Sequence, residues 1–485
     1  MGISGLLPLL KPITKKTHLR DFSGKTVAID GYSWIHKGVY GSGLAIFEGK
    51  DVSSHVTYCI KRLSMFLDAG VTPIFVFDGG PLPMKAGQEA ERKSEEARKV
   101  VTRALKSKDR RMAWEYANRC IDVTPEMVAQ LTVELQARKI AYIVAPYEAD
   151  AQMAFLVKNG FADAVVSEDS DMLLFGCPQL GADGTGDLIQ LEDIAKVASF
   201  KGFSHLQFRQ TCILSGCDYL ASLPKVGMGT AIRLMQTNRS IDAIFKALRS
   251  PTSNYDEQAI EAYIKGFILA DLTFSHQRVW DPCKQSIVTL EPIGAALSAS
   301  SWIPQDLANI LCTNDAEFVP SSFEEWPFPV RRLEFLGPPI TDPKIASGIA
   351  LGAICPITKK TLNILPAPTE AHVFGVQVLK EPLEKKKPTK LPWLTRLSLK
   401  PAISIMKNEA IDKRNLDTGN SDKENMLLQP EFVEAQSPVS KHHNFNAADK
   451  AVPTAPEGEV KRRRISPYFE NRRKASLSIE PQLSD

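Results

Sequence analysis

The chain lacks the short motifs that mark several common kinds of enzyme. Its 485 residues contain no G-x-S-x-G elbow, no H-E-x-x-H helix and no G-x-x-x-x-G-K-[ST] loop, which excludes the usual routes to acyl transfer, zinc proteolysis and ATP hydrolysis. Its eight cysteines include no C-x-x-C pair, which argues against zinc or dithiol chemistry and favours a reduced, intracellular protein.

Long apolar runs and a large excess of one charge sign are also missing. The longest apolar runs, such as Ile74 to Phe77, are far too short to span a bilayer, and the first residues carry no secretory or myristoylation signal. We therefore expect no membrane partner. A net charge of +3 leaves a nucleic-acid partner open, and 44% hydrophobic content suffices for one large domain or two ordinary ones. Nothing in the sequence indicates more than a monomer.

The hydrophobic pattern of the first half predicts a parallel sheet. Short β-branched or aromatic runs indicate four buried strands at Thr26 to Ile29, Pro73 to Phe77, Ala141 to Val144 and Ala164 to Val166. Helical patterns between them are clearest at 56–69 and 125–139. The order strand, helix, strand predicts a doubly wound α/β domain.

The second half is predicted to be helical and then to lose its structure. Residues 208–248 carry a helical pattern interrupted by the turn-rich segment 223–229, and further helix is expected at 257–274. Beyond about residue 380 the composition shifts to Lys, Pro, Ser, Asn and Glu without periodicity. Such a composition cannot bury enough apolar surface to fold, so we expect residues 380–485 to be a disordered tail.

Acidic residues follow three of the predicted strands. Asp30 and Asp78 come directly after the first two strands, at the carboxyl edge where open α/β sheets bind their ligands. Asp169 and Asp171 lie two positions apart after the fourth strand, and an extended segment would point both side chains the same way. The sequence therefore brings four carboxylates to one edge.

Three further acids are expected to join this edge. Glu148 and Asp150 stand at the predicted start of a helix, and Asp218 follows Cys217 in the helical half. Any one of these acids alone reads best as a cap or a solvated surface charge. Seven together would repel strongly unless cations neutralised them, and hard oxygen ligands favour magnesium, which manganese can replace, over zinc. Two such ions about 4 Å apart clamp the attacking and leaving oxygens of a phosphodiester, so the cluster predicts a metal-dependent nuclease.

The first residues and three internal motifs resemble one nuclease superfamily, that of flap endonuclease, exonuclease one and XPG. These motifs are MGISGLL at 1–7, PYEADAQ at 146–152, SEDSD at 167–171 and GCDYL at 216–220. Within the superfamily, LFGC at 174–177, CILSGCDYL at 212–220 and the long tail look more like the exonuclease one branch. The match runs from Met1 to about Asn363.

The resemblance implies a fold and an activity. It implies a PIN-like 5′-nuclease core, with an N-terminal nuclease region at 1–100, a helical arch at 84–124, an internal nuclease region at 138–207, a helix-two-turn-helix DNA-binding region at 208–248 and a helical remainder at 249–365. The implied activity is 5′ to 3′ removal of nucleotides from double-stranded DNA at ends, nicks and gaps, plus cleavage of 5′ flaps, in mismatch repair, resection and recombination. The seven acids would hold two magnesium ions. A flap or gap endonuclease with little exonuclease activity remains an alternative, as does a catalytically impaired repair scaffold.

The resemblance also assigns roles outside the acids. Lys85 and Arg92 fall where the family places cations that stabilise charge on the scissile phosphate, although the charge-rich stretch from 84 to 111 also fits a solvated helix laced with ion pairs. Tyr32 could stack on the terminal nucleotide, or simply pack at the rim, and His36 resembles a residue of the same gateway. Gly227 and Gly229 resemble the loop whose backbone amides and a bound monovalent cation, such as potassium, meet a DNA phosphate.

The tail carries two short motifs, and the sequence departs from the family at two places. A basic run in the tail fits a nuclear import signal or a plain solvated cluster, and nuclear location is the better interpretation. The run consists of Lys461, Arg462, Arg463 and Arg464. The next residues form the hydrophobic half of a sliding-clamp binding motif: Ile465, Tyr468 and Phe469. This segment could instead bind a mismatch-repair protein, or its pattern could be accidental. After Cys177 a strand's worth of sequence expected in the family is absent, and Lys225 replaces the first glycine of the phosphate loop.

Overall fold

The residues that the structure, a computed structural model, describes all lie in the first of two units of the chain, Met1–Ala410. It describes residues 2–50, 52–85, 88–167, 169–175, 185–251, 255–293, 302–304, 307, 331–362 and 402–405. Within these ranges no helix is long and apolar enough to cross a membrane.

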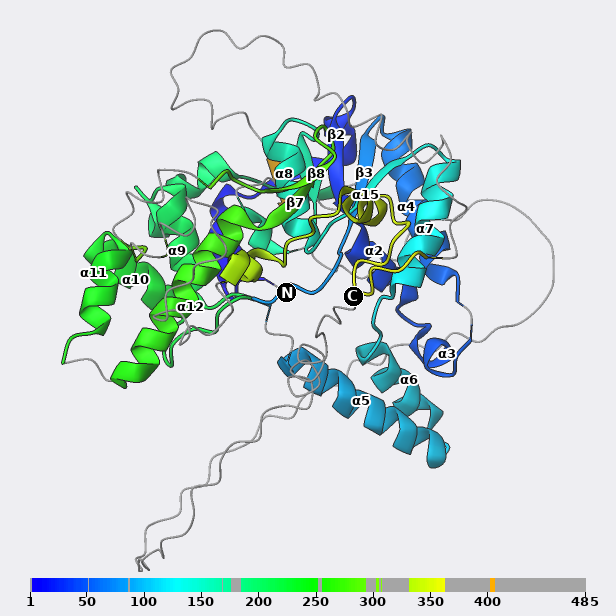
Figure 1. Cartoon of the computed structure of the whole chain (residues 1–485), viewed down its shortest axis with the longest axis horizontal. Helices are drawn as coiled ribbons and strands as arrows, with labels where there is room; N and C mark the ends of the chain where they lie inside the picture. Colours follow the sequence, from blue (N-terminus) through cyan, green and yellow to red (C-terminus); the bar gives the residue numbers. More distant parts are fainter. Residues whose placement is uncertain are drawn as a thin grey trace, which may run out of the picture. The chain divides into compact units, whose positions relative to one another are not determined.

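A seven-stranded sheet forms the centre of this unit, in the order β1-β6-β9-β5-β2-β3-β4 (Figure 1). Four neighbouring strands are parallel: β5 (Ala164–Val166), β2 (Thr26–Asp30), β3 (Thr72–Phe77) and β4 (Ala141–Val144). These are the four strands that the sequence predicts, and the prediction is confirmed. β2 has a later strand on either side, so the connections diverge there and create the switch point where such sheets bind ligands.

Hydrophobic patterning does not predict the other three strands, which add two antiparallel pairs to the sheet. β1 (Lys15–His18) pairs with β6 (Thr185–Gln190), and β6 pairs with β9 (Ala402–Ile405). β9 also runs parallel to β5. Residues 402–405 are the part of the predicted tail, 380–485, that falls within the described ranges.

Helices cover both faces of the parallel strands, which confirms the doubly wound α/β class. On one face, α2 (Gly31–Val39), α4 (Ser54–Asp68) and α7 (Pro125–Ala137) share a core with Val27 and Ile29. Because successive strand residues point to opposite faces, Ala28 belongs to the core of the other face.

The second face is covered by α8 (Ala149–Lys158) and by a helical region that Figure 1 shows in green. This region contains α9 (His205–Ser215), α10 (Met228–Asn238), α11 (Ile241–Leu248) and α12 (Glu257–His276), as the helical pattern predicts. Arg209 of α9 and Asp271 of α12 form a buried ion pair, with Nε to Oδ1 at 2.7 Å and Nη2 to Oδ2 at 3.1 Å. Removal of either partner would leave the other charge buried and unpaired, which typically costs about 3–5 kcal/mol.

Two helices between β3 and α7 form a separate hairpin, α5 (Gln88–Lys106) and α6 (Arg110–Arg119). Asp109 ends the turn between them by accepting a hydrogen bond from the Met112 amide. A small core of mostly alanine and valine side chains joins the pair to α3 (Gly43–Phe47). Figure 1 shows this hairpin extending away from the sheet. It occupies the stretch where the family resemblance places an arch.

The remaining elements are short. They are α1 (Leu6–Leu10), α15 (Pro343–Ala350), the hairpin strands β7 (Arg278–Asp281) and β8 (Ser286–Thr289), and the 3-10 helices η1 (Lys11–Ile13), η2 (Leu19–Phe22), η3 (Ser170–Leu173), η4 (Leu191–Lys196), η5 (Ala198–Phe200) and η7 (Arg331–Leu336).

Candidate active site

Two acids stand at the carboxyl ends of neighbouring parallel strands, as predicted. Asp30 is the last residue of β2 and caps α2, because its Oδ1 accepts a hydrogen bond from the Ser33 amide at 3.0 Å. Asp78 follows β3, and its Oδ1 accepts a hydrogen bond of 2.7 Å from the Ala149 amide at the start of α8. Both carboxylates are thus held by the positive ends of helices.

A glycine allows the chain after Asp78 to approach β4 closely. A Cβ atom on Gly79 would lie 1.9 Å from the carbonyl oxygen of Ala145, so no other residue fits there without moving the backbone. The Gly79 amide donates to the carbonyl of Tyr147. This contact brings the residue after Asp78 beside the residue before Glu148.

The two acids after β5 do not lie on an extended segment, so that expectation is wrong. Asp169 caps the 3-10 helix η3, and Asp171 lies in its first turn, where the Asp171 amide donates to Asp169 Oδ1 at 3.0 Å. A side chain that can bond the backbone two residues on favours such a turn over an extended strand. The acids still meet the cluster, since Ser167 before them donates to Asp30 Oδ2 at 3.4 Å.

Glu148 and Asp150 lie at the start of α8, as predicted, and Glu148 is the most heavily bonded acid of the site. Its Oε1 lies 2.9 Å from Lys85 Nζ. Its Oε2 accepts hydrogen bonds from the Tyr219 hydroxyl at 2.5 Å and from Gln277 Nε2 at 2.7 Å. Asp150 lies in the first turn of the same helix.

Asp218 reaches the cluster from a turn after α9. Backbone hydrogen bonds between Cys217 and Leu220 close this turn, and Lys85 Nζ lies 3.6 Å from Asp218 Oδ2. All seven predicted acids therefore come together from three strand ends, one helix start and one turn. Among the described side chains, the cation that lies between these acids is Lys85.

Burial and mutual repulsion raise the pKa of five of these acids. Burial, reinforced by Asp78, raises the pKa of Asp30 to about 7. Burial raises the pKa of Asp78, although Lys85 opposes the effect. Burial together with the neighbouring carboxylates raises the pKa values of the other three acids: Asp150, Asp169 and Asp171. Burial alone would lower the pKa of Lys85, but Glu148 and the other acids outweigh it and raise that pKa.

The donor set suits magnesium, but the side chains do not form a ready-made cage. Within the described ranges, no three acidic, histidine or cysteine side chains converge closely enough to hold one metal ion. Carboxylates draw apart unless a cation lies among them, and here Lys85 and hydrogen-bond donors neutralise them instead. Two observations nevertheless fit a hard cation: all seven side chains offer oxygen, and buried Asp171 Oδ1 accepts no hydrogen bond from any described residue.

Other predicted site residues lie around this cluster. Tyr32 in α2 is half-buried, and its hydroxyl donates to the Val123 carbonyl at 3.2 Å. His36 lies one turn further along α2 and is exposed. Gly227 caps α10 and Gly229 lies in its first turn, and a Cβ atom on either would meet no atom within 4 Å. The fold's own packing therefore does not require glycine at these two positions.

Some predicted residues cannot be placed. The side chain of Arg92 lies outside the described part, although its backbone belongs to α5. The basic run and the hydrophobic motif of the tail also lie outside the described residues: Lys461, Arg462, Arg463, Arg464, Ile465, Tyr468 and Phe469. The same holds for the segment after Cys177, where a strand is expected in the family.

Sequence reasoning missed two residues of the site, Tyr219 and Gln277. Both side chains are buried and both donate to Glu148 Oε2. Tyr219 could have been found, because it directly follows Asp218 in one of the motifs. Gln277 follows α12 and carries no sequence signal, since its role depends on a residue 129 positions earlier.

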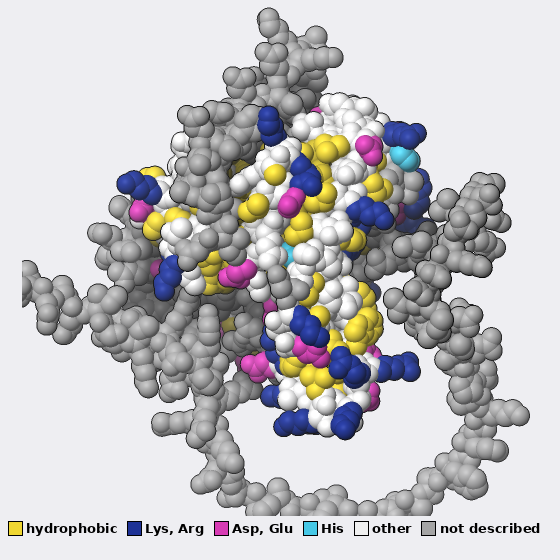
Figure 2. Space-filling view, turned by 90° about the vertical axis from the view of Figure 1, so that its right-hand side faces the viewer, with side chains coloured by type: hydrophobic (Ala, Val, Ile, Leu, Met, Phe, Trp, Pro, Cys, Tyr) yellow, Lys and Arg dark blue, Asp and Glu magenta, His cyan; other side chains and the backbone are white. Residues whose placement is uncertain are grey.

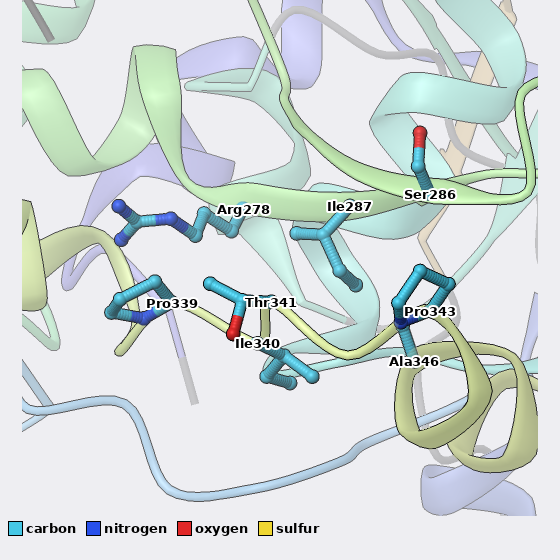
Figure 3. A pocket seen from close by; sticks show the side chains of 8 residues that line it. All are labelled: Arg278, Ser286, Ile287, Pro339, Ile340, Thr341, Pro343 and Ala346. Atoms are coloured by element: carbon cyan, nitrogen blue, oxygen red, sulfur yellow. The ribbon is translucent and has the colours of Figure 1, made fainter.

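A cavity of about 320 Å³ lies elsewhere, between the β7–β8 hairpin and the segment leading into α15 (Figure 3). Its lining mixes polar and apolar side chains, among them Arg278, Ile287 and Ile340. Arg278 Nη1 donates to the carbonyl oxygens of Leu333 and Gly337, at 2.8 Å in the first case. None of the seven acids lines this cavity, so it is separate from the carboxylate site.

Comparison with known proteins identifies the family. Two family models match: the XPG N-terminal domain over residues 1–99 and the XPG I-region over residues 139–218. Exodeoxyribonuclease 1 of Schizosaccharomyces pombe is 32% identical over 499 aligned positions, which cover 100% of this chain and 82% of that protein. The chain belongs to the exonuclease 1 branch of the XPG family. The family resemblance carried by the sequence motifs is thus confirmed.

Other exonuclease 1 relatives match a part of the chain. Exonuclease 1 of Arabidopsis thaliana is 39% identical over 322 residues, or 64% of this chain, and the chain spans 43% of the plant protein's length. Among solved structures, the flap endonuclease-1 of Methanococcus jannaschii is 25% identical, with coverage of 52% of this chain and 82% of that chain and a TM-score of 0.36.

Proposed function

We propose that the chain is a 5′ to 3′ double-stranded DNA exonuclease that also cleaves 5′ flaps. The gathering of seven carboxylates and Lys85 at the carboxyl edge of a parallel sheet carries this proposal. Relatives named Exonuclease 1 and Exodeoxyribonuclease 1 support it. DNA mismatch repair, resection and recombination are the processes that need such an activity.

Two magnesium ions, which manganese can replace, are the proposed cofactor. Bound there, they supply Lewis-acid stabilisation of the attacking and leaving oxygens of a phosphodiester. The residues that would hold them are Asp30, Asp78, Glu148, Asp150, Asp169, Asp171 and Asp218.

Lys85 is proposed to meet the scissile phosphate. Its ammonium group already lies among the acids, and its side chain is 43% exposed, so it can be reached by a substrate. A cation at this place would neutralise charge that develops on the phosphate during hydrolysis, and Arg92 at the start of α5 would add to it.

DNA binding is proposed to involve three parts of the surface. The ring of Tyr32 and the exposed His36 would contact the terminal nucleotide beside Asp30. The amides at the start of α10, where Gly227 and Gly229 leave open space, would bind a backbone phosphate together with a monovalent cation such as potassium. Figure 2 shows Lys and Arg side chains gathered low on one face, where Figure 1 places α5 and α6. Such contacts to phosphates make binding fall steeply with salt.

The first experiment measures magnesium-dependent release of nucleotides from a 5′-labelled duplex with a recessed 5′ end. We expect activity in the wild-type chain and in Asp68→Asn, an exposed acid at the end of α4, and none in Asp171→Asn. Inactivity of the wild-type chain with DNA binding retained would instead support the impaired scaffold. Rates on a recessed end and on a free flap separate an exonuclease from a flap or gap endonuclease, since only the former degrades both.

Nuclear location and a tail partner are further proposals that rest on the sequence. Replacing the basic run 461–464 with alanine should move a fluorescent fusion out of the nucleus. A peptide covering residues 460–472 should bind a sliding clamp or a mismatch-repair protein in calorimetry and should lose that binding when Tyr468 and Phe469 are changed to alanine. Retained import, or no binding to either protein, would remove these proposals.

A further inference from the structure

The buried side chain of Gln152 bonds the backbone of a strand. Its Nε2 donates to the carbonyl oxygen of Trp280 at 2.8 Å, and its Oε1 accepts a hydrogen bond of 2.7 Å from the Trp280 amide. Gln152 has no exposed surface, and Trp280 is 2% exposed. One side-chain amide on α8 thus satisfies both backbone groups of a residue in β7, the strand beside it in Figure 1.

This contact closes the edge of β7 that does not face β8. Among the described strands, β7 pairs only with β8. The backbone groups of Trp280 that bond Gln152 would otherwise be buried without a partner, which is unfavourable. Gln152 therefore holds β7 against α8.

Glu148 lies one helical turn before Gln152. The two residues are four positions apart at the start of α8, so their side chains share one face of the helix. β7 begins directly after Gln277, whose Nε2 donates to Glu148 Oε2 at 2.7 Å. The first turns of α8 therefore bond the same stretch of chain at two points, at Gln277 and at Trp280.

The orientation of Gln277 is set by the carboxylate that it meets. Its backbone is held on both sides, because its amide donates to the Thr273 carbonyl at 3.2 Å and its carbonyl accepts from the Leu290 amide at 2.9 Å. Its side chain is fully buried, and its Oε1 accepts no hydrogen bond from any described residue. A buried oxygen without a donor is uncommon and calls for a reason. Turning the amide over would place this oxygen against Glu148 Oε2, so Glu148 determines which way the amide points.

We propose that Gln152 is a positioning residue for Glu148, and that it acts through β7 and Gln277. By holding Trp280 on α8, Gln152 fixes the start of β7, and the start of β7 places the Gln277 amide against Glu148 Oε2. The other carboxylate oxygen, Oε1, faces Lys85 and the acid cluster. The role of Glu148 as a metal ligand belongs to the proposed function, so this inference rests on it.

The place of Gln152 in the motif at 146–152 fits such a role. Glu148 and Asp150 of that motif are proposed metal ligands, whereas both polar atoms of Gln152 are bonded to Trp280. Glutamine is the side chain of this length that carries a donor and an acceptor side by side at any pH. Methionine at this position would fill similar space but bond neither backbone group of Trp280.

Manganese binding to the full-length chain without DNA, followed by electron paramagnetic resonance, tests this role without nuclease activity. Gln277→Met should weaken manganese affinity about 10-fold and Gln152→Met about 5-fold, because the orientation of Glu148 is loosened in both. Gln210→Met is the matched control, since Gln210 is another buried glutamine, in α9, and its replacement should leave the affinity unchanged.

The double variant Gln152→Met/Gln277→Met separates this pathway from a general loosening of the fold. If Gln152 acts through Gln277, the double variant should bind manganese as well as Gln277→Met does, because the contact that Gln152 positions is already lost. Two independent effects would multiply instead, to about 50-fold. Thermal unfolding checks the fold of each variant, and Gln152→Glu, which keeps only the acceptor for the Trp280 amide, replaces Gln152→Met if that variant does not fold.

Multiplied losses in the double variant, or wild-type manganese affinity in Gln152→Met, would overturn the assignment and leave the proposed nuclease function intact. A wild-type chain that binds no manganese would overturn the proposed metal site, and this inference with it. The nuclease assay adds a second readout: the magnesium concentration for half-maximal activity should rise in Gln152→Met, while kcat at saturating magnesium changes less. A lower kcat with an unchanged magnesium requirement would show that Gln152 serves the fold alone.

Discussion

The hydroxyl of Tyr219 donates a hydrogen bond of 2.5 Å to Glu148 Oε2. Gln277 Nε2 donates to the same oxygen, and both donors are buried. One oxygen of Glu148 is therefore fixed from the helical region, and the other faces Lys85. Outer partners of this kind orient an acidic ligand before a metal binds.

Tyr219→Phe is expected to raise the magnesium concentration needed for half-maximal activity by about 10-fold, because Glu148 loses one of its two orienting donors. The ring remains packed 4.6 Å from Phe274, centroid to centroid, so the fold should be retained. A magnesium titration of nuclease rate, with thermal unfolding as a check on folding, measures this. An unchanged magnesium requirement would mean that Tyr219 serves packing only.

The sequence predicted the parallel half of the sheet because each of its strands is a short, continuous apolar run. It did not predict β1, whose sequence Lys-Lys-Thr-His is polar, nor β9, because antiparallel partners at a sheet edge are chosen by tertiary pairing. Asp30 and Asp78 could be placed from the strands before them. The turn at Asp169 and Asp171 could not, because a local side-chain to backbone bond overrides the expected extension.

Lys85→Met should lower turnover by about 100-fold while the Kd for DNA changes much less, because a cation among the acids acts on charge that develops during hydrolysis. Lys99→Met removes an exposed cation of α5 and is the matched control, expected to weaken binding slightly without changing turnover. Single-turnover rates and fluorescence anisotropy separate the two quantities. Equal losses of affinity and turnover in Lys85→Met would contradict this role.

Asp171→Asn should stabilise the metal-free chain by about 1 kcal/mol while it abolishes stabilisation by magnesium. Burial and the neighbouring Asp169 and Asp218 raise the pKa of Asp171, so the ionised form is held at a cost that the neutral amide avoids. Urea unfolding with EDTA and with magnesium measures both effects, and Asp68→Asn is the control. A magnesium response of normal size in Asp171→Asn would remove this acid from the proposed ligand set.

His205 should make the chain less stable in acid. Its Nε2 donates to the Leu173 carbonyl at 2.9 Å, and burial, with a smaller effect of Arg209, lowers its pKa from 6.5 to about 4. Between these two values the unfolded chain binds the extra proton, so stability falls as the pH drops from 6.5 to about 4, by up to about 3 kcal/mol. His205→Asn, which keeps a donor but no titratable group, should flatten this part of the curve of unfolding free energy against pH. Parallel curves for the two chains would show that His205 titrates normally.

Lys225→Gly should stabilise the chain by about 0.5–1 kcal/mol. A left-handed backbone conformation costs a residue with a side chain roughly 1–2 kcal/mol, and glycine avoids this cost. The greater freedom of glycine in the unfolded chain offsets part of the gain. Lys225 has φ of 67° in the loop before α10, the position at which the family resemblance expects glycine. Lys246→Gly, in the exposed face of α11, is the matched control and should destabilise by about 1 kcal/mol, because glycine within a helix only adds unfolded-state freedom. The urea midpoint of unfolding should shift upward in Lys225→Gly and downward in Lys246→Gly, relative to the wild-type chain. Loss of stability in both variants would show that the Lys225 side chain stabilises the fold by more than its backbone strain destabilises it.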